Sequence, residues 1–309
     1  MAGHFADRLL AAIEAKGSPV CVGIDPVYER LPAELHQDFS DEVERAEPMG
    51  RFCFEVLEIV APIVPAVKIQ SAHFERYGSV GVDLYRLVVD AALDRGLVVI
   101  GDVKRNDIGP TAEAYARGHL TGLFSPFGPG TAVPDAITVN GYFGADGLRP
   151  FVDVAADAGR GIFVLVRTSN PSAAEIQDFQ GPGGKKLYEH MAEQVAGIGS
   201  DKRLIGQRGY SCVGAVVGAT YPDEARRLRE IMPRQVFLVP GYGAQGATAE
   251  DCAAAFQRDG TGAIVNASRS VLYAWRREGR GEKDWRKAVE AAAKAFAEDI
   301  RRAVANAGR

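Results

Sequence analysis

Three charged residues, Asp102, Lys104 and Asp107, follow an apolar run that begins at Leu97, and they carry the clearest chemical signal in the sequence. Side chains alternate faces along a strand, so Asp102 and Lys104 are expected to point the same way while Val103 points opposite. Asp107 falls in the loop beyond the strand, within reach of both. An acid and a base side by side at a strand end can stabilise developing charge and transfer a proton.

Eight short apolar runs, separated by helical patterns, must position these charges. The runs are rich in Val, Ile and Ala, as parallel strands buried on both faces require. They predict strands at 20–24, 66–69, 98–103, 136–139, 163–166, 213–217, 237–239 and 263–266. Helical patterns include 41–60, 82–95, 144–158, 222–231, 247–258 and 285–307. This alternation predicts an α/β protein, a (β/α)8 TIM barrel formed by residues 1–309 as one domain.

Two segments exceed the minimal barrel pattern. Residues 120–133 contain several Gly and Pro residues and predict a loop before the fourth strand. Residues 177–212 form a long insertion between strands five and six, with a helix near 187–196. Because the insertion follows a strand on the face where barrel active sites lie, we interpret it as a lid region. A decorated surface loop is the alternative.

The composition and charge of the chain restrict the classes of protein to which it can belong. The chain has 309 residues, of which 47% are hydrophobic and 25% charged, with a net charge of −4. Mixed charges of this kind argue against a nucleic-acid surface. No apolar run approaches the roughly 18–20 residues of a membrane span, and the N-terminus lacks a signal-peptide pattern. Four well-separated cysteines without a CxxC pair indicate a reducing, cytoplasmic compartment.

Charges also end the first two predicted strands. Asp25 follows the first and shares a face with Cys21, while Lys68 lies at the end of the second, so both join Asp102 and Lys104 at one barrel mouth. A structural salt-bridge network is the alternative, but buried ions cost several kcal/mol each in desolvation. A Schiff-base role for either lysine is also conceivable. A neighbouring carboxylate disfavours it, because it keeps the amine protonated.

The loops after strands seven and eight have the composition of a phosphate site. Gly241, Tyr242 and Gly243 follow the seventh strand, and Arg269 follows the eighth. Barrel phosphate sites favour these loops, because glycines let N–H groups approach and arginine offers a bidentate fork. The alternative is a glycine-rich turn beside a surface arginine.

The run from Asp102 to Thr111 resembles the signature of orotidine 5'-phosphate decarboxylases, which complete UMP synthesis. Its DxKxxD core is shared with related sugar-phosphate decarboxylases, whereas the longer DxKxxDIGxT form is more specific. Supporting segments occur in the family's order: Gly23-Ile-Asp-Pro26, Val67-Lys-Ile-Gln70, Thr168-Ser-Asn-Pro171, Pro240-Gly-Tyr-Gly-Ala-Gln245 and Ala267-Ser-Arg269. Asn170 stands where histidine is common, which, with the insertion, suggests the longer-chain bacterial branch.

The resemblance implies a role for each matched residue. Lys104 would deliver a proton to the carbon that loses CO2, and Asp102 would lie beside the substrate carboxylate. Asp25 and Lys68 would hold the ribose hydroxyls. Asp107, with Ile108 and Thr111, would reach the active site of a second subunit in a homodimer. The remaining substrate-binding residues would be Ser169 at the pyrimidine, Gln245 between base and phosphate, and Pro240, Gly241, Tyr242, Gly243, Ser268 and Arg269 around the phosphate.

The implied reaction is cofactor-free conversion of orotidine 5'-phosphate to UMP and CO2 by a carboxy-lyase of pyrimidine biosynthesis. The five histidines form no ligand-spaced cluster, and the sequence indicates neither a metal nor an organic cofactor. One alternative is a magnesium-dependent 3-keto sugar-phosphate decarboxylase, which shares only the DxKxxD core. Another is a catalytically silent nucleotide-binding barrel.

Overall fold

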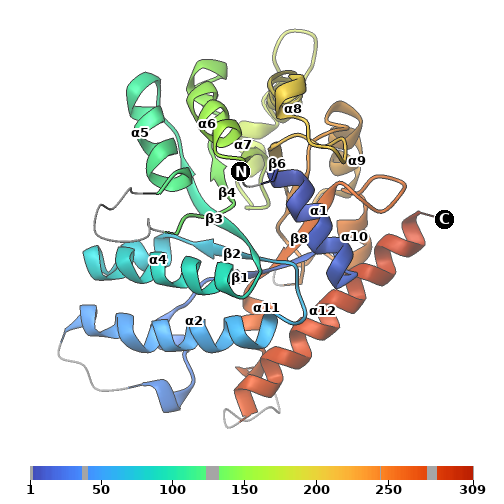
Figure 1. Ribbon diagram of the computed structural model, residues 1–309. Helices are drawn as coiled ribbons and strands as arrows, with labels where there is room; N and C mark the ends of the chain where they lie inside the picture. Colours follow the sequence, from blue (N-terminus) through green and yellow to red (C-terminus); the bar gives the residue numbers. More distant parts are fainter. Residues whose placement is uncertain (1–2, 37–40, 123–131, 244, 277–283, 309) are drawn as a thin grey trace.

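Eight parallel strands close into a barrel in the order β1 to β8, in agreement with the fold predicted from the sequence. The computed structural model describes residues 3–36, 41–122, 132–243, 245–276 and 284–308. The strands, at the centre of Figure 1, are β1 Val20–Ile24, β2 Ala66–Gln70, β3 Val98–Arg105, β4 Ala136–Val139, β5 Gly161–Arg167, β6 Val213–Val217, β7 Phe237–Val239 and β8 Ala263–Ala267.

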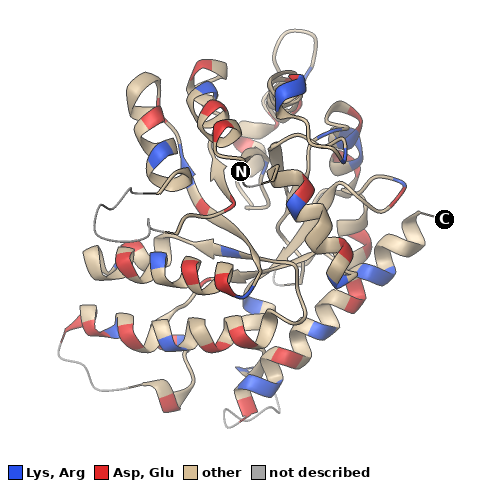
Figure 2. Ribbon diagram, in the orientation of Figure 1, with Lys and Arg blue, Asp and Glu red and all other residues tan. Residues whose placement is uncertain are grey.

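Helices surround the barrel (Figure 1), and α12 packs beside α2 on its outside. The bounds are α1 Phe5–Lys16, α2 Ala46–Val60, α3 Ala72–Glu75, α4 Gly78–Asp94, α5 Gly109–Leu120, α6 Ala145–Asp157, α7 Ala173–Gln177, α8 Leu187–Ile198, α9 Pro222–Ile231, α10 Ala249–Ala253, α11 Arg269–Leu272 and α12 Trp285–Ala307. Acidic and basic residues are interspersed along the outer helices (Figure 2). Among the described helices, none is both long and apolar enough to cross a bilayer.

Most predicted bounds are correct to within a few residues, and two helices start or end differently. The helix predicted from residue 41 begins at Ala46, after a 3₁₀ turn at Glu42–Arg45 that the Asp41 carboxylate caps. Pro48 then occupies the first turn of α2, where a missing N–H costs least. The helix predicted at 247–258 ends already at Ala253. Most of the predicted 120–133 loop lies outside the described residues.

The third strand is two residues longer than predicted and changes its pairing before it ends. Its register against β4 shifts between Gly101 and Arg105. Lys104 lies within this irregular stretch, and its φ of 44° falls in the left-handed region. A residue other than glycine in such a conformation costs on the order of 1–3 kcal/mol and persists only when its surroundings hold it.

Candidate active site

A cavity of about 510 Å³ opens at the carboxyl ends of the strands. Residues at or directly after the end of every strand line it, and these are Asp25 (directly after β1), Lys68, Asp102 and Lys104 (both of β3), Thr138, Leu165, Val216, Leu238 and Asn266. Polar side chains come from β1 to β4 and from β8, whereas β5 to β7 supply apolar ones. Among the strand residues, the lining thus has a charged side and an apolar side, and the apolar side lowers the local dielectric around the charges.

The carboxylate of Asp102 is the centre of the charged side. Its Oδ2 accepts hydrogen bonds from Lys68 Nζ at 2.7 Å and from Gln70 Nε2 at 3.0 Å. Its Oδ1 accepts hydrogen bonds from Lys104 Nζ at 2.5 Å and from the Thr138 hydroxyl at 2.9 Å. Asp25 lies 3.8 Å from Lys68 Nζ. The structure therefore brings together the four charges predicted at the first three strand ends.

In this cluster, burial and the neighbouring charges shift the pKa values of Asp102 and Lys68 in opposite directions, and the neighbouring charges have the larger effect. Burial alone would raise the pKa of Asp102, but Lys68 and Lys104 outweigh it and hold that pKa well below its usual range. Burial would lower the pKa of Lys68, but Asp25 and Asp102 outweigh it and raise that pKa. Both groups stay charged at neutral pH. A lysine held protonated in this way is poorly suited to imine formation, which argues against a Schiff base at Lys68.

The loops after β7 and β8 form a further part of the cavity lining. Pro240, Gly241, Tyr242 and Gln245 line it from the first loop, and Ser268 and Arg269 from the second. Gly241 has a φ of 118°, which a side chain would strain. The Tyr242 hydroxyl donates to Asp299 of α12 at 2.7 Å, and its ring lies 4.8 Å from that of Phe296. This anchor on α12 fixes the backbone of the loop.

Comparison with known proteins identifies the family. A model of the orotidine 5'-phosphate decarboxylase / HUMPS family matches residues 18–283. A Rhodopirellula baltica protein named orotidine 5'-phosphate decarboxylase is 44% identical over 297 residues, covering 93% of this chain and 96% of that protein. This chain belongs to the orotidine 5'-phosphate decarboxylase family. A Caldicellulosiruptor bescii protein of the same name is 39% identical over 97% of this chain and 99% of its own. The structure of Leishmania donovani OMP decarboxylase matches with a TM-score of 0.75 at 29% identity, covering 97% and 99%.

Membership of the orotidine 5'-phosphate decarboxylase family confirms the resemblance found in the 102–111 motif. The cavity collects most residues that the resemblance singled out, including Ser169. Gly243 belongs to the loop after β7 but does not line the cavity. Within the described ranges, no group of three or more His, Cys, Asp or Glu side chains is placed to hold a metal ion.

Asp107, Ile108 and Thr111 lie outside this cavity, just beyond the end of β3. The Asp107 carboxylate accepts a hydrogen bond from the backbone N–H of Ile108, and the Ile108 side chain is 54% exposed. Thr111 is exposed on the first turn of α5. The three residues therefore lie next to one another on the outer surface, and they do not line the cavity of their own chain.

Two polar residues that line the cavity were not predicted as site residues from the sequence. Thr138 and Asn266 lie inside predicted strands and have apolar neighbours in the sequence. Nothing in their residue type therefore indicated that they belong to a site. In the closed barrel both positions face the cavity that Lys68 and Asp102 also line. Period-two alternation applied to all eight predicted strands would have placed them on that face.

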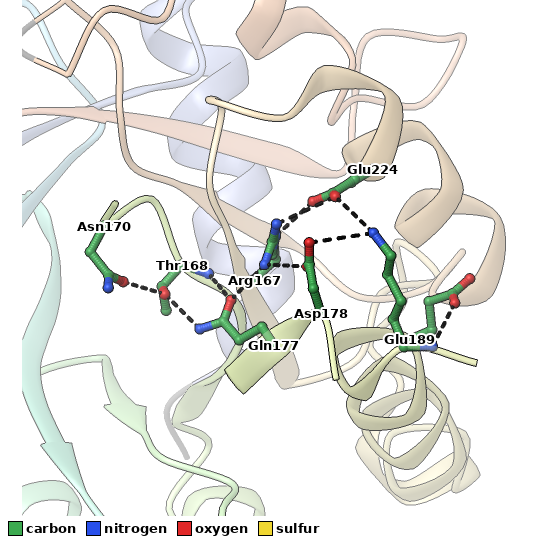
Figure 3. A network of polar contacts seen from close by, with 8 residues as sticks. Arg167, Thr168, Asn170, Gln177, Asp178, Glu189 and Glu224 are labelled. Carbon is green, nitrogen blue, oxygen red and sulfur yellow. Dashed lines mark hydrogen bonds and ion pairs between the residues drawn. The ribbon is translucent and has the colours of Figure 1, made fainter. Parts of the chain in front are cut away.

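The side of the cavity that Ser169 lines is bordered by a polar network at the base of the insertion (Figure 3). Thr168, which lines the cavity beside Ser169, donates from its backbone N–H to Gln177 Oε1 at 3.0 Å, and its hydroxyl accepts from Gln177 Nε2 at 2.7 Å. Arg167, the last residue of β5, is 1% exposed and binds Glu224 at 2.6 Å and Asp178 at 2.9 Å. The insertion is therefore tied to the barrel where it leaves β5.

Replacing Arg167 by methionine should destabilise the protein. Among the described residues, the change leaves Asp178 and Glu224 with the more distant cation of Lys186, which lies 3.5 and 3.8 Å away. We expect the free energy of unfolding, measured in urea, to fall by about 3 kcal/mol. This is the lower end of the range for breaking a buried ion pair, because both carboxylates keep some contact with water. The matched control is Glu193→Gln, which breaks the exposed Lys185–Glu193 pair of the same insertion and should change nothing measurable. Equal stability of both variants would contradict this structural role.

Proposed function

We propose that the protein converts orotidine 5'-phosphate to UMP and CO2 and so acts as a carboxy-lyase in pyrimidine biosynthesis. The observation that carries this proposal is the carboxylate of Asp102 held between the ammonium groups of Lys68 and Lys104 at the cavity floor. It supports the proposal together with the family match, since relatives that align over nearly the whole chain carry this name.

Lys104 is proposed as the proton donor. Loss of CO2 leaves negative charge on a ring carbon that has no covalent electron sink, so a fixed ammonium beside that carbon is the main stabiliser available. The Lys104 side chain is 47% exposed at the cavity, whereas Lys68 is 8% exposed, so Lys104 is the more accessible cation. Lys68 and Asp25 are then free to hold the ribose hydroxyls.

Asp102 is proposed to lie beside the carboxylate that leaves. Two carboxylates about 4 Å apart repel by roughly 4 kcal/mol at an effective dielectric of 20. One preorganised electrostatic contact supplies about 2.7–4 kcal/mol, whereas enzymes lower barriers by about 8–23 kcal/mol. Binding energy from the remote phosphate must therefore contribute, and we assign that end to Gly241, Ser268 and Arg269.

We propose further that the protein is a homodimer in which Asp107, Ile108 and Thr111 reach the partner's cavity. Ile108 is exposed, and so are the large apolar side chains of Tyr115, Tyr142 and Phe143 on the neighbouring α5 and the loop after β4. Such an exposed apolar group suits an interface between subunits. We also propose one domain over residues 1–309 and a cytoplasmic location, which the four buried free cysteines favour.

The insertion is proposed as a lid over the pyrimidine. Its base is tied to the barrel by the Arg167 network, so closure would concern the hairpin between α7 and α8, where Gly183 and Gly184 have positive φ. Phe179 in this hairpin is 69% exposed and offers an apolar surface for closure over a bound base.

Incubation of the purified protein with orotidine 5'-phosphate tests the activity directly. Turnover should appear as loss of the orotate chromophore, and its absence would overturn the proposal. The same assay in EDTA separates this activity from that of a magnesium-dependent 3-keto sugar-phosphate decarboxylase, because only the latter should stop. Activity on a 3-keto sugar phosphate but not on orotidine 5'-phosphate would favour that alternative.

A further inference from the structure

One buried hydroxyl contacts both Asp102 and Lys104. The Thr138 side chain comes from β4, is 1% exposed as a residue and lines the cavity. It donates to Asp102 Oδ1 at 2.9 Å and accepts from the backbone N–H of Lys104 at 3.0 Å. We propose that Thr138 is a positioning residue that fixes the orientation of the Asp102 carboxylate and the backbone of Lys104. The inference rests on the proposed roles of those two residues.

The direction of both hydrogen bonds follows from the chemistry of the groups. The backbone N–H of Lys104 can only donate, so the Thr138 oxygen accepts from it. The ionised carboxylate of Asp102 can only accept, so the Thr138 proton must point toward it. The hydroxyl therefore has one defined orientation, and it completes a set in which each oxygen of Asp102 accepts from two donors.

The backbone contact explains how Lys104 keeps its unusual conformation. Among the described residues other than glycine, Lys104 alone has a positive φ. The β3–β4 pairing is interrupted there and resumes with the hydrogen bond from Asn140 N–H to the Arg105 carbonyl. Within the interruption, the N–H of Lys104 finds its acceptor in a side chain. This hydrogen bond helps to hold the turn of backbone from which the ammonium group reaches back to Asp102.

Packing alone gives no reason for a hydroxyl at this position. Thr138 lies between Ile137 and Val139 in a strand that is buried throughout. Valine has the same branched shape and would fill the same volume without a polar atom to satisfy. The hydroxyl serves only Asp102 and Lys104 among the contacts described for it, and its function is therefore tied to them.

Thr138→Val tests the proposal because it removes the hydroxyl and keeps the shape. We expect kcat for orotidine 5'-phosphate to fall about 10²-fold, the effect of a displaced reacting group, with KM and the Kd of UMP changed less than about threefold. Thr138→Ser keeps the hydroxyl and should recover most of kcat. If the valine variant does not fold, Thr138→Ala replaces it in the comparison with serine.

Ser211→Ala is the matched control for a lost buried hydroxyl. Ser211 accepts from the N–H of Val213 just before β6, at the end of the barrel away from the cavity, so its loss should affect stability and not kcat. A folded Thr138→Val with kcat within twofold of the wild type would overturn the inference, as would a serine variant as slow as the valine variant. Inactivity of the wild type would instead overturn the proposed function.

Discussion

Replacing Lys104 by alanine is expected to reduce turnover of orotidine 5'-phosphate below detection while UMP still binds. The substitution removes both the ammonium charge and the proton that the product carbon needs. Loss of one preorganised electrostatic contact costs about 10²–10³-fold and loss of a general acid about 10²–10⁴-fold. Stopped assays for turnover and calorimetry with UMP measure the two effects separately.

The variant should fold, which makes a loss of activity interpretable. The Lys104 side chain is half exposed, and Asp102 keeps its hydrogen bonds from Lys68, Gln70 and Thr138 after the change. Lys68→Ala is less informative, because it removes a buried cation between Asp25 and Asp102.

Lys294→Ala provides the matched control for the loss of a lysine. Lys294 lies on α12 and pairs with the exposed Glu290, so we expect wild-type turnover from this variant. Substantial activity in Lys104→Ala would show that the proton comes from another group and would remove Lys104 from the proposed mechanism. Loss of UMP binding in the same variant would move Lys104 to a binding role.

The barrel and its charged mouth could be predicted because both follow from local patterns. Each strand is a short apolar run, and a closed parallel sheet brings the carboxyl ends of all strands to one face. Lys68 and Asp102 are far apart in the chain, yet placing each at a strand end was enough to predict that both lie at one barrel mouth, where the structure shows them 2.7 Å apart.

A hydrogen bond that one hydroxyl makes to the neighbouring strand could not be predicted in the same way. The bond from Thr138 to Asp102 depends on the register of β4 against β3, and that register shifts at this point. The left-handed backbone of Lys104 has no signature in the sequence, because lysine gives no local reason for it. The Arg167 network likewise joins β5, the insertion and α9, which only the folded chain brings together.

Mixing two inactive variants should restore activity if the active sites are shared between subunits. In a dimer of one Asp107→Ala chain and one Lys104→Ala chain, one cavity combines the intact Lys104 of its own chain with the intact Asp107 of the other. The second cavity lacks both. With random exchange in a symmetric dimer, half of the dimers are mixed, so about a quarter of all sites should be active.

A second mixture distinguishes sharing from nonspecific rescue. Asp102 and Lys104 line the same cavity in one chain, so in a mixed dimer of Asp102→Ala and Lys104→Ala each cavity carries one of the two substitutions. We therefore expect no recovery from that pair. Recovery in the first mixture alone identifies Asp107 as the contribution of the partner. No recovery there, with mixed dimers shown by differently tagged chains, would place Asp107 outside the partner's active site and leave its exposed position beyond β3 without a role in the reaction.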